Sequence, residues 1–145
     1  MNNKAELLAL AAEVETSDPS RELDARIAIA VGFEPEGLFP HTLAGAIKYY
    51  AEDMEGLVDD MNSHHSALSQ IPHYTTSLDA AYSLVPDGWR LKHLGETFDH
   101  PEFGVRMRCD LELTLTEYVI SFHKKSFCHA VIAASLRAMA REMES

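Results

Sequence analysis

The sequence predicts an α+β fold in which a small, mostly antiparallel three-stranded sheet is flanked by helices, as in an α/β/α sandwich. Two segments near the C-terminal end alternate polar and apolar residues across a short connection, which indicates a β-hairpin. Stretches with apolar residues three and four positions apart precede and follow them, which indicates amphipathic helices. The chain has 145 residues, 46% of them hydrophobic, enough for one domain with a buried core. This domain divides into a helical N-terminal part (3–31), an inserted helix (about 42–62) and a helix–sheet–helix core (72–143).

The N-terminal part is expected to form two helices. Apolar residues in 3–15 have helical spacing. In the second helix Ser17 or Asp18 is the expected N-cap, Pro19 suits the first helical position, and Gly32 ends the apolar stripe.

The segment 42–62 is predicted to be one long helix. Apolar residues recur every three or four positions from Leu43 to Met61, and most acidic residues lie off that stripe. A helix of about 20 residues would be ~30 Å long. Two interpretations stay open: an ordinary surface helix with a solvated acidic face, or a helix for self-association.

The stretch PHYTTSLDAAYSLVPDGW, residues 72–89, is expected to form a corner between a helix and a strand. Thr76 or Ser77 would cap a short helix that Asp79 stabilises in its first turn. A Pro-Asp-Gly turn follows, and Trp89 begins a strand. Trp89 and Tyr82 are predicted to pack in the core or at this corner.

Strands are predicted at 89–94, 105–113 and 117–124, with the last two forming the hairpin. In two antiparallel strands, the numbers of paired residues have a constant sum, and this sum defines the register. If the sum for the second and third strands is odd, the aromatic side of the third strand is buried beside Met107. If it is even, Phe122 lies beside Arg108. We therefore predict the odd register. The other face would then collect a set of polar residues: Arg106, Arg108, Ser121, His123 and Lys125. A final helix begins at Ser126, its expected N-cap.

Composition limits the classes of partner and compartment. The net charge of −11 makes duplex nucleic acid a poor partner, because such binding depends on neutralising phosphates. Cys109 and Cys128 lie in apolar runs, as buried thiols do in a reducing cytoplasm. The N-terminal segment lacks the features of a signal peptide, and no run approaches the ~20 apolar residues that span a bilayer. We expect a cytoplasmic protein with no membrane partner.

Three segments carry a resemblance to a known family: SRELDARIAIAVGF, HYTTSLDAAYSLVPDGW and CHAVIAASLRAMA. Together they resemble the phage ABA sandwich domain family, small proteins encoded by phages and prophages. The resemblance implies helices on both sides of a sheet and a bacterial host cytoplasm, and it assigns no activity. The inserted helix at 42–62 and the SFCH start of the last helix depart from the family pattern. The charged face of strand 105–113 also suggests that part of the sheet is open, since a fully covered sheet is apolar on both faces.

Cationic residues near the hairpin form a candidate anion site. Helix starts at Ser77 and Ser126 would add backbone N–H donors, and Tyr74 or Trp89 would stack on a base. The alternative is a solvated strand face whose arginines pair with Asp110 and Glu112. The candidate ligand-binding residues are Tyr74, Thr75, Ser77, Trp89, Arg90, Arg106, Arg108, His123, Lys125 and Ser126.

Other chemistry has little support in the sequence. The eight histidines are scattered, with no zinc-binding pattern among them. The chain has no GxSxG, P-loop or glycine-rich dinucleotide motif, and Asp79 reads as a carboxylate at a helix start. We expect neither a metal, nor a cofactor, nor a catalytic residue.

These observations predict a non-enzymatic phage accessory protein that binds a small anionic, nucleotide-like ligand. Its anti-defence role would be to sequester a nucleotide signal used by the host. The alternative is a protein–protein interaction module, in which the acidic segment 42–62 forms a homo-oligomer or blocks a host protein. An enzyme acting on a small phosphorylated compound is the third hypothesis.

Overall fold

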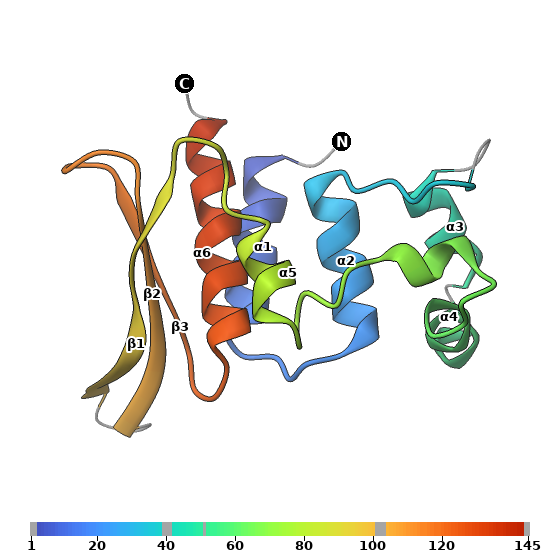
Figure 1. Cartoon of the computed structure of the whole chain (residues 1–145), viewed down its shortest axis with the longest axis horizontal. Helices are drawn as coiled ribbons and strands as arrows, with labels where there is room; N and C mark the ends of the chain where they lie inside the picture. Colours follow the sequence, from blue (N-terminus) through green and yellow to red (C-terminus); the bar gives the residue numbers. More distant parts are fainter. Residues whose placement is uncertain (1–2, 39–41, 51, 101–103, 144–145) are drawn as a thin grey trace.

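The computed structural model describes residues 3–38, 42–50, 52–100 and 104–143, and confirms the α+β class. Within these residues the chain forms six α-helices, one short 3₁₀ helix and a three-stranded antiparallel sheet (Figure 1). The sheet lies at one end of the molecule, α6 and α1 pack beside it, and α2, α3 and α4 follow toward the other end. None of the described helices is both long and apolar enough to span a bilayer.

The first two helices form where the apolar spacing predicts them. Helix α1 (Lys4–Val14) begins with a capping box between Asn3 and Glu6. Helix α2 (Arg21–Val31) ends at Gly32, whose φ of 78° is the left-handed conformation that glycine adopts without a steric penalty. The predicted N-cap was wrong: Ser20, and neither Ser17 nor Asp18, caps α2, because its Oγ accepts the Leu23 N–H at 3.0 Å.

The single long helix predicted at 42–62 is two short helices, α3 (Leu43–Tyr49) and α4 (Met54–Met61). The cause is local: Asp53 acts as an N-cap, with its carboxylate accepting the Gly56 N–H at 3.0 Å, so a new helix begins there. The Tyr50 hydroxyl donates to Asp60 across the break. This hydrogen bond raises the pKa of Tyr50 to about 12, because it stabilises the protonated phenol.

The corner predicted at 72–89 is present. A 3₁₀ helix (Ala67–Gln70) leads into α5 (Leu78–Tyr82), which Ser77 caps by accepting the Ala80 N–H at 3.2 Å. Trp89 is buried, and its indole N–H donates to Glu142 at the end of α6 (3.1 Å). Tyr82 is 47% exposed, so of the two places predicted for it, the core or the corner, the core is wrong.

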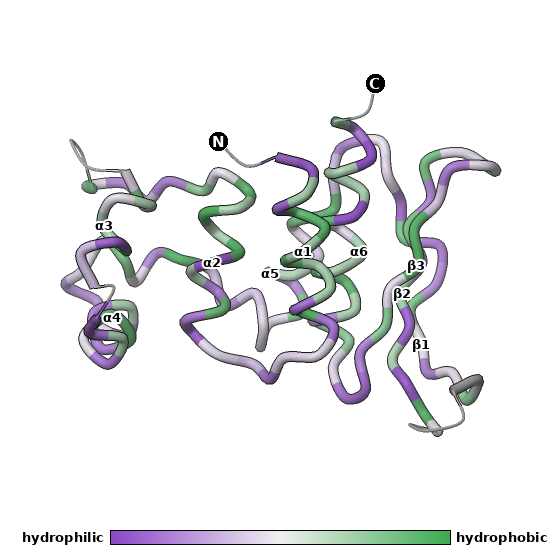
Figure 2. Tube along the Cα trace, turned by 180° about the vertical axis from the view of Figure 1, so that it is seen from behind, coloured by the Kyte–Doolittle hydropathy of each residue, from purple (hydrophilic) through white to green (hydrophobic). Residues whose placement is uncertain are grey.

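The sheet has the order β1–β2–β3 and is antiparallel throughout. Strand β1 (Arg90–His100) is longer than predicted, whereas β2 (Gly104–Glu112) and β3 (Tyr118–His123) match the expected segments closely. Seen from the back, α1 lies beside α6, the helix next to the sheet (Figure 2). All described helices are on this one side, so the second helix layer of a sandwich is not part of the described fold.

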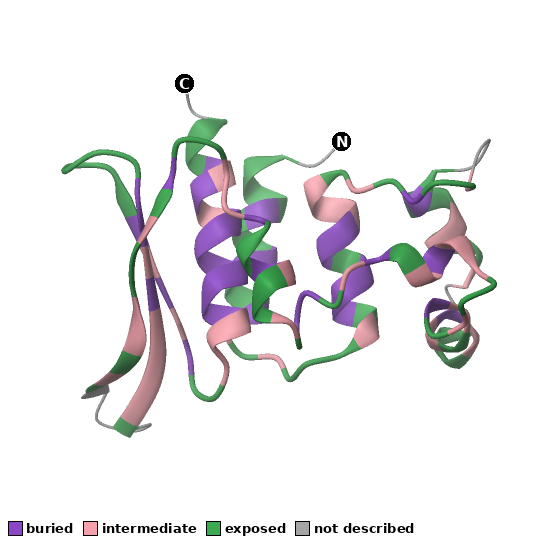
Figure 3. Ribbon diagram, viewed as in Figure 1, coloured by how far each residue is buried: buried purple, intermediate pink, exposed green. Residues whose placement is uncertain are grey.

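Helix α6 (Phe127–Glu142) is the centre of the core. Its N-cap is Ser126, as predicted, and nearly every residue from His129 to Ala140 is buried (Figure 3). A helix that is apolar on most sides must be enclosed by other elements. Here the sheet encloses α6 on one side, and α1 and α5 on others.

The predicted register of β2 and β3 was wrong. Met107 pairs with His123 and Arg108 with Phe122, so paired residue numbers sum to an even value. Val119, Ser121 and His123 therefore face the helices, and all three are buried. The polar inner residues have partners, since Arg137 Nη1 donates to Ser121 Oγ at 2.6 Å. On the outer face, the guanidinium carbon of Arg106 lies 3.8 Å from the centroid of the Phe122 ring. This cation–π contact stabilises the aromatic ring without full burial.

The register can be tested with paired cysteines. The Phe122 N–H donates to Glu15 and so points away from β2, which makes Arg108–Phe122 a non-hydrogen-bonded pair with Cα atoms ~4.5 Å apart. We expect Arg108→Cys/Phe122→Cys to form a disulfide under mild oxidation, measured by mass spectrometry after thiol alkylation. The control is Met107→Cys/Phe122→Cys, whose side chains lie on opposite faces. Cross-linking of the control in place of the first pair would establish the odd register instead.

Candidate functional site

The ten residues predicted to bind a ligand do not converge on one site. Tyr74, Thr75 and Ser77 lie near the start of α5, and Trp89 is buried at the corner before β1. The remaining six residues lie in the sheet and in the loop that follows β3. Arg90, Arg106 and Arg108 are on the open face of the sheet, His123 is in the interior, and Lys125 and Ser126 are between β3 and α6.

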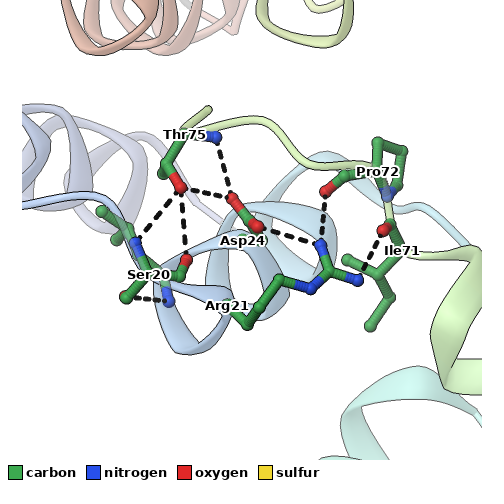
Figure 4. Close-up of polar contacts among 7 residues, drawn as sticks. Ser20, Arg21, Asp24, Ile71, Pro72 and Thr75 are labelled. Atoms are coloured by element: carbon green, nitrogen blue, oxygen red, sulfur yellow. Dashed lines mark hydrogen bonds and ion pairs between the residues drawn. The ribbon is translucent and has the colours of Figure 1, made fainter. Parts of the chain in front are cut away.

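Thr75 belongs to a buried polar network that joins α2 to the segment before α5 (Figure 4). The Asp24 carboxylate accepts the Thr75 N–H and the Thr75 hydroxyl, each at 2.8 Å. Its second oxygen accepts Arg21 Nη1 at 2.9 Å. The same guanidinium also donates to the carbonyls of Ile71 (2.9 Å) and Pro72 (3.2 Å). A buried carboxylate with three donors is stabilised by them and is not available to a ligand.

Tyr74 and Thr75 are therefore structural residues. Both are buried, and burial, with a smaller effect from Asp24, raises the pKa of Tyr74 to about 12. Tyr74 offers no exposed ring on which a base could stack. Trp89 is excluded as a stacking residue on the same ground, since its ring is buried and its N–H is bound to Glu142.

Arg90, Lys92 and Arg108 of the open sheet face are paired with carboxylates. Arg108 contacts Asp110 through two nitrogens, at 2.7 and 2.9 Å. Arg90 and Lys92 lie 3.5 and 3.7 Å from the buried Glu112 carboxylate. This part of the face matches the alternative interpretation, a charged surface whose ions neutralise one another.

A pocket of about 300 Å³ lies where the C-terminal end of β3 meets the loop after α1. Phe122 and Arg106 form the wall from the sheet, and Lys124 lies at the end of β3. Glu15 and Thr16 close the opposite wall. The Glu15 carboxylate accepts the Phe122 N–H at 2.8 Å and Arg137 Nη2 at 2.6 Å, so its position is fixed and its charge is offset. Glu15 and Phe122 are 107 positions apart, and no local signal in the sequence connects them.

His123 and His129 form a buried pair behind this pocket, with ring centroids 4.3 Å apart. The backbone N–H groups of Lys125 and Ser126 donate to His123 Nδ1 at 3.0 and 2.9 Å. This requires the ring proton to be on Nε2, which donates to the Ser17 carbonyl at 2.8 Å. Burial and the neighbouring His123 lower the pKa of His129 to about 4.

The described residues offer little for covalent or metal chemistry. Burial raises the pKa of the Cys109 thiol to about 12 and also raises that of Cys128, so both thiols are poor nucleophiles. No group of three or more His, Cys, Asp or Glu side chains in the described part of the chain is arranged to hold a metal ion.

Comparison with known proteins yields no relative. No family model matches the chain, and neither a curated protein nor a solved structure does so.

The network around Asp24 predicts a large loss of stability on mutation. Asp24→Ala leaves the largely buried Arg21 guanidinium without its carboxylate and removes the acceptor of the Thr75 N–H and hydroxyl. Together, these two losses should lower the free energy of unfolding by about 3 kcal/mol. Glu22→Ala, an exposed carboxylate of the same helical turn, should cost less than ~1 kcal/mol. Urea denaturation measures both, and equal effects would show that the network does not stabilise the fold.

The buried histidine pair predicts a loss of stability in mild acid. Because the pKa of His129 is about 4 in the folded chain and ~6.5 when unfolded, the unfolded state binds the proton first as the pH falls. The ring of His123 opposes protonation, whereas Asp18 and Asp24 favour it weakly. His129 should therefore reduce the free energy of unfolding by up to about 3 kcal/mol between pH 6.5 and 4.

The measurement is urea denaturation at a series of pH values, for the wild type and for His129→Gln. The variant should lose stability less steeply than the wild type over this range. Parallel curves for the two proteins would contradict the assignment.

Proposed function

We propose that the chain is a non-enzymatic binding protein that takes a small anionic ligand into the pocket beside Arg106 and Phe122. The observation that carries this proposal is the stacked pair itself, a guanidinium 3.8 Å from an aromatic centroid in the wall of a pocket of about 300 Å³. The volume is at the lower end of the ~300–1,000 Å³ range of ligand sites, which suits a small ligand.

The charges around the pocket favour an anion. Arg106 and Lys124 supply two cationic groups, and Glu15, the one carboxylate among the described residues that line the pocket, already binds Arg137. Arginine forms two parallel hydrogen bonds with phosphate or carboxylate oxygens. A planar base would lie against the Arg106–Phe122 pair, in place of the stacking on Tyr74 or Trp89 that the sequence suggested.

The ligand class we favour is a nucleotide. A phosphate would contact Arg106 and Lys124, and the base would use the stacked pair. With the resemblance to phage ABA sandwich proteins, we propose that the chain is a phage or prophage accessory protein that sequesters a nucleotide signal of host defence. Both cysteine thiols are poorly ionised, so a covalent step on either of them is disfavoured.

The alternative based on the acidic segment 42–62 has weaker support. A self-association helix would need an exposed apolar stripe. Three residues of that stripe, Leu43, Leu57 and Met61, are buried inside this chain, whereas Met54 is 37% exposed.

Thermal shift measurements with a panel of mono-, di- and cyclic nucleotides test the proposal. A ligand at 100 times its Kd should stabilise the fold by ~2.7 kcal/mol and raise Tm by several degrees. Arg106→Gln should weaken binding about tenfold or more, whereas Arg108→Gln, which removes the arginine paired with Asp110, should retain it. The bound nucleotide should be recovered intact after incubation. The absence of any Tm shift, or equal losses in both variants, would refute the proposal.

A further inference from the structure

A groove of about 420 Å³ follows the outer side of β3, between this strand and helices α1 and α6. Lys4 and Leu8 of α1 form one wall, and Arg137 and Arg141 of α6 form another. Residues of β3, among them Tyr118 and Ile120, form the third side. The groove is therefore bounded by two helices and by the edge of a sheet.

Strand β3 is an edge strand, because the sheet order is β1–β2–β3. The Phe122 N–H donates to Glu15 and so points away from β2. In an antiparallel ladder every second residue has this orientation, so Ile120 and Tyr118 also direct their N–H and C=O groups outward. Glu15 binds the edge at Phe122, next to the first pocket. Further along β3, the outward N–H and C=O groups of Ile120 and Tyr118 border the groove. Such a strand edge is a template for pairing with another strand.

The charge of the groove differs from that of the whole chain. Among the described residues, its lining includes Lys4, Arg137 and Arg141 and no acidic side chain, although the net charge of the chain is −11. The Arg137 guanidinium is bound to Glu15 (2.6 Å) and Ser121 (2.6 Å), so its charge is offset, and Lys4 and Arg141 are the other cationic side chains of the described lining. A partner with acidic side chains is complementary to this lining, whereas a basic one would meet like charges.

Apolar contacts are available both on the α1 wall and on the sheet side of the groove. Leu8 is 39% exposed and Tyr118 is 50% exposed, and Ile120 lies on the same sheet face as Tyr118. A strand added to β3 would turn alternate side chains to the two faces of the sheet. Side chains on the helix face would meet Lys4 and Arg141, and those on the open face would meet Tyr118 and Ile120.

We propose that this groove binds an extended acidic peptide segment of a partner protein, which adds to β3 as a fourth strand. Backbone hydrogen bonds to Ile120 and Tyr118 supply affinity, and the cationic helix side selects acidic residues at alternate positions. This surface is used independently of the nucleotide pocket, since it does not involve Arg106.

The probe is a fluorescein-labelled peptide of about eight residues that alternates Glu and Val, the length of an ordinary strand. Its control alternates Lys and Val. Fluorescence anisotropy should show saturable binding of the first peptide only, and the amide NMR signals of Tyr118 and Ile120 should shift on titration.

Three variants locate the site. Arg141→Ala should weaken binding about fivefold, and Ile120→Pro should weaken it about tenfold or more, because proline removes an outward N–H that β2 does not use. Lys48→Ala, which removes one exposed positive charge on α3 at the opposite end of the molecule, should change Kd less than about twofold. If Ile120→Pro does not fold, as judged by circular dichroism, Arg141→Ala and the NMR shifts decide.

The opposite results would overturn the proposal. These are no saturation up to about 1 mM peptide, equal binding of the lysine peptide, or equal effects of Arg141→Ala and Lys48→Ala. Sedimentation of the wild type as a dimer that Arg141→Ala or Ile120→Pro dissociates would assign the edge to a second copy of the chain instead.

The two proposed surfaces can be tested separately. Loss of nucleotide binding in Arg106→Gln with normal peptide binding would show that the groove acts independently of the pocket.

Discussion

The buried imidazole of His123 determines how the sheet meets the helices. Its Nε2–H donates to the Ser17 carbonyl after α1, and its Nδ1 accepts two N–H groups at the turn into α6. One side chain thus joins β3, the α1–α2 connection and the start of α6. These bonds are satisfied only when His123 faces inward, because buried polar groups without partners cost free energy. Since side chains alternate along a strand, an inward His123 requires an outward Phe122, and the pocket beside Arg106 exists only in that register.

A second set of buried hydrogen bonds unites two motifs that lie far apart in the sequence, SRELD and HYTTS. SRELD opens α2 and HYTTS precedes α5, and the Asp24 carboxylate binds Thr75 across 51 positions of sequence. Arg21 extends this contact to the carbonyls of Ile71 and Pro72. The polar residues of these motifs therefore have a structural explanation that needs no ligand. Polar residues that stand together in a sequence motif are weak evidence for a binding site when their side chains are buried and mutually satisfied.

The parts of the fold that follow from local signals were predictable. Ser77 and Ser126 cap their helices and Gly32 ends α2, because these preferences act within one turn of chain. Asp53 is also a local cap signal, but the apolar spacing of 42–62 obscured it. The register of β2 and β3 was not predictable from hydrophobic alternation, because it depends on Arg137 reaching Ser121 and on Ser17 reaching His123. The candidate site was missed for the same reason, since Glu15 and Phe122 meet only in the folded chain.

The alternation of β3 also explains why both proposed surfaces adjoin one short strand. Val119, Ser121 and His123 face the helices and stabilise the core, whereas Tyr118, Ile120 and Phe122 face outward, beside the two proposed surfaces. Cationic groups line the two pockets beside the outer residues, although the chain as a whole carries a charge of −11. Across the ladder, Ile120 and Tyr118 pair with Asp110 and Glu112, whose carboxylates are paired with cations of the sheet. Exposed charges are screened over ~10 Å at moderate ionic strength, so an anion close to β3 is influenced mainly by these neighbours and little by the acidic helix α4 at the far end of the molecule. A slip of one residue would expose His123 and bury Phe122, and it would remove the pocket and alter the strand edge together.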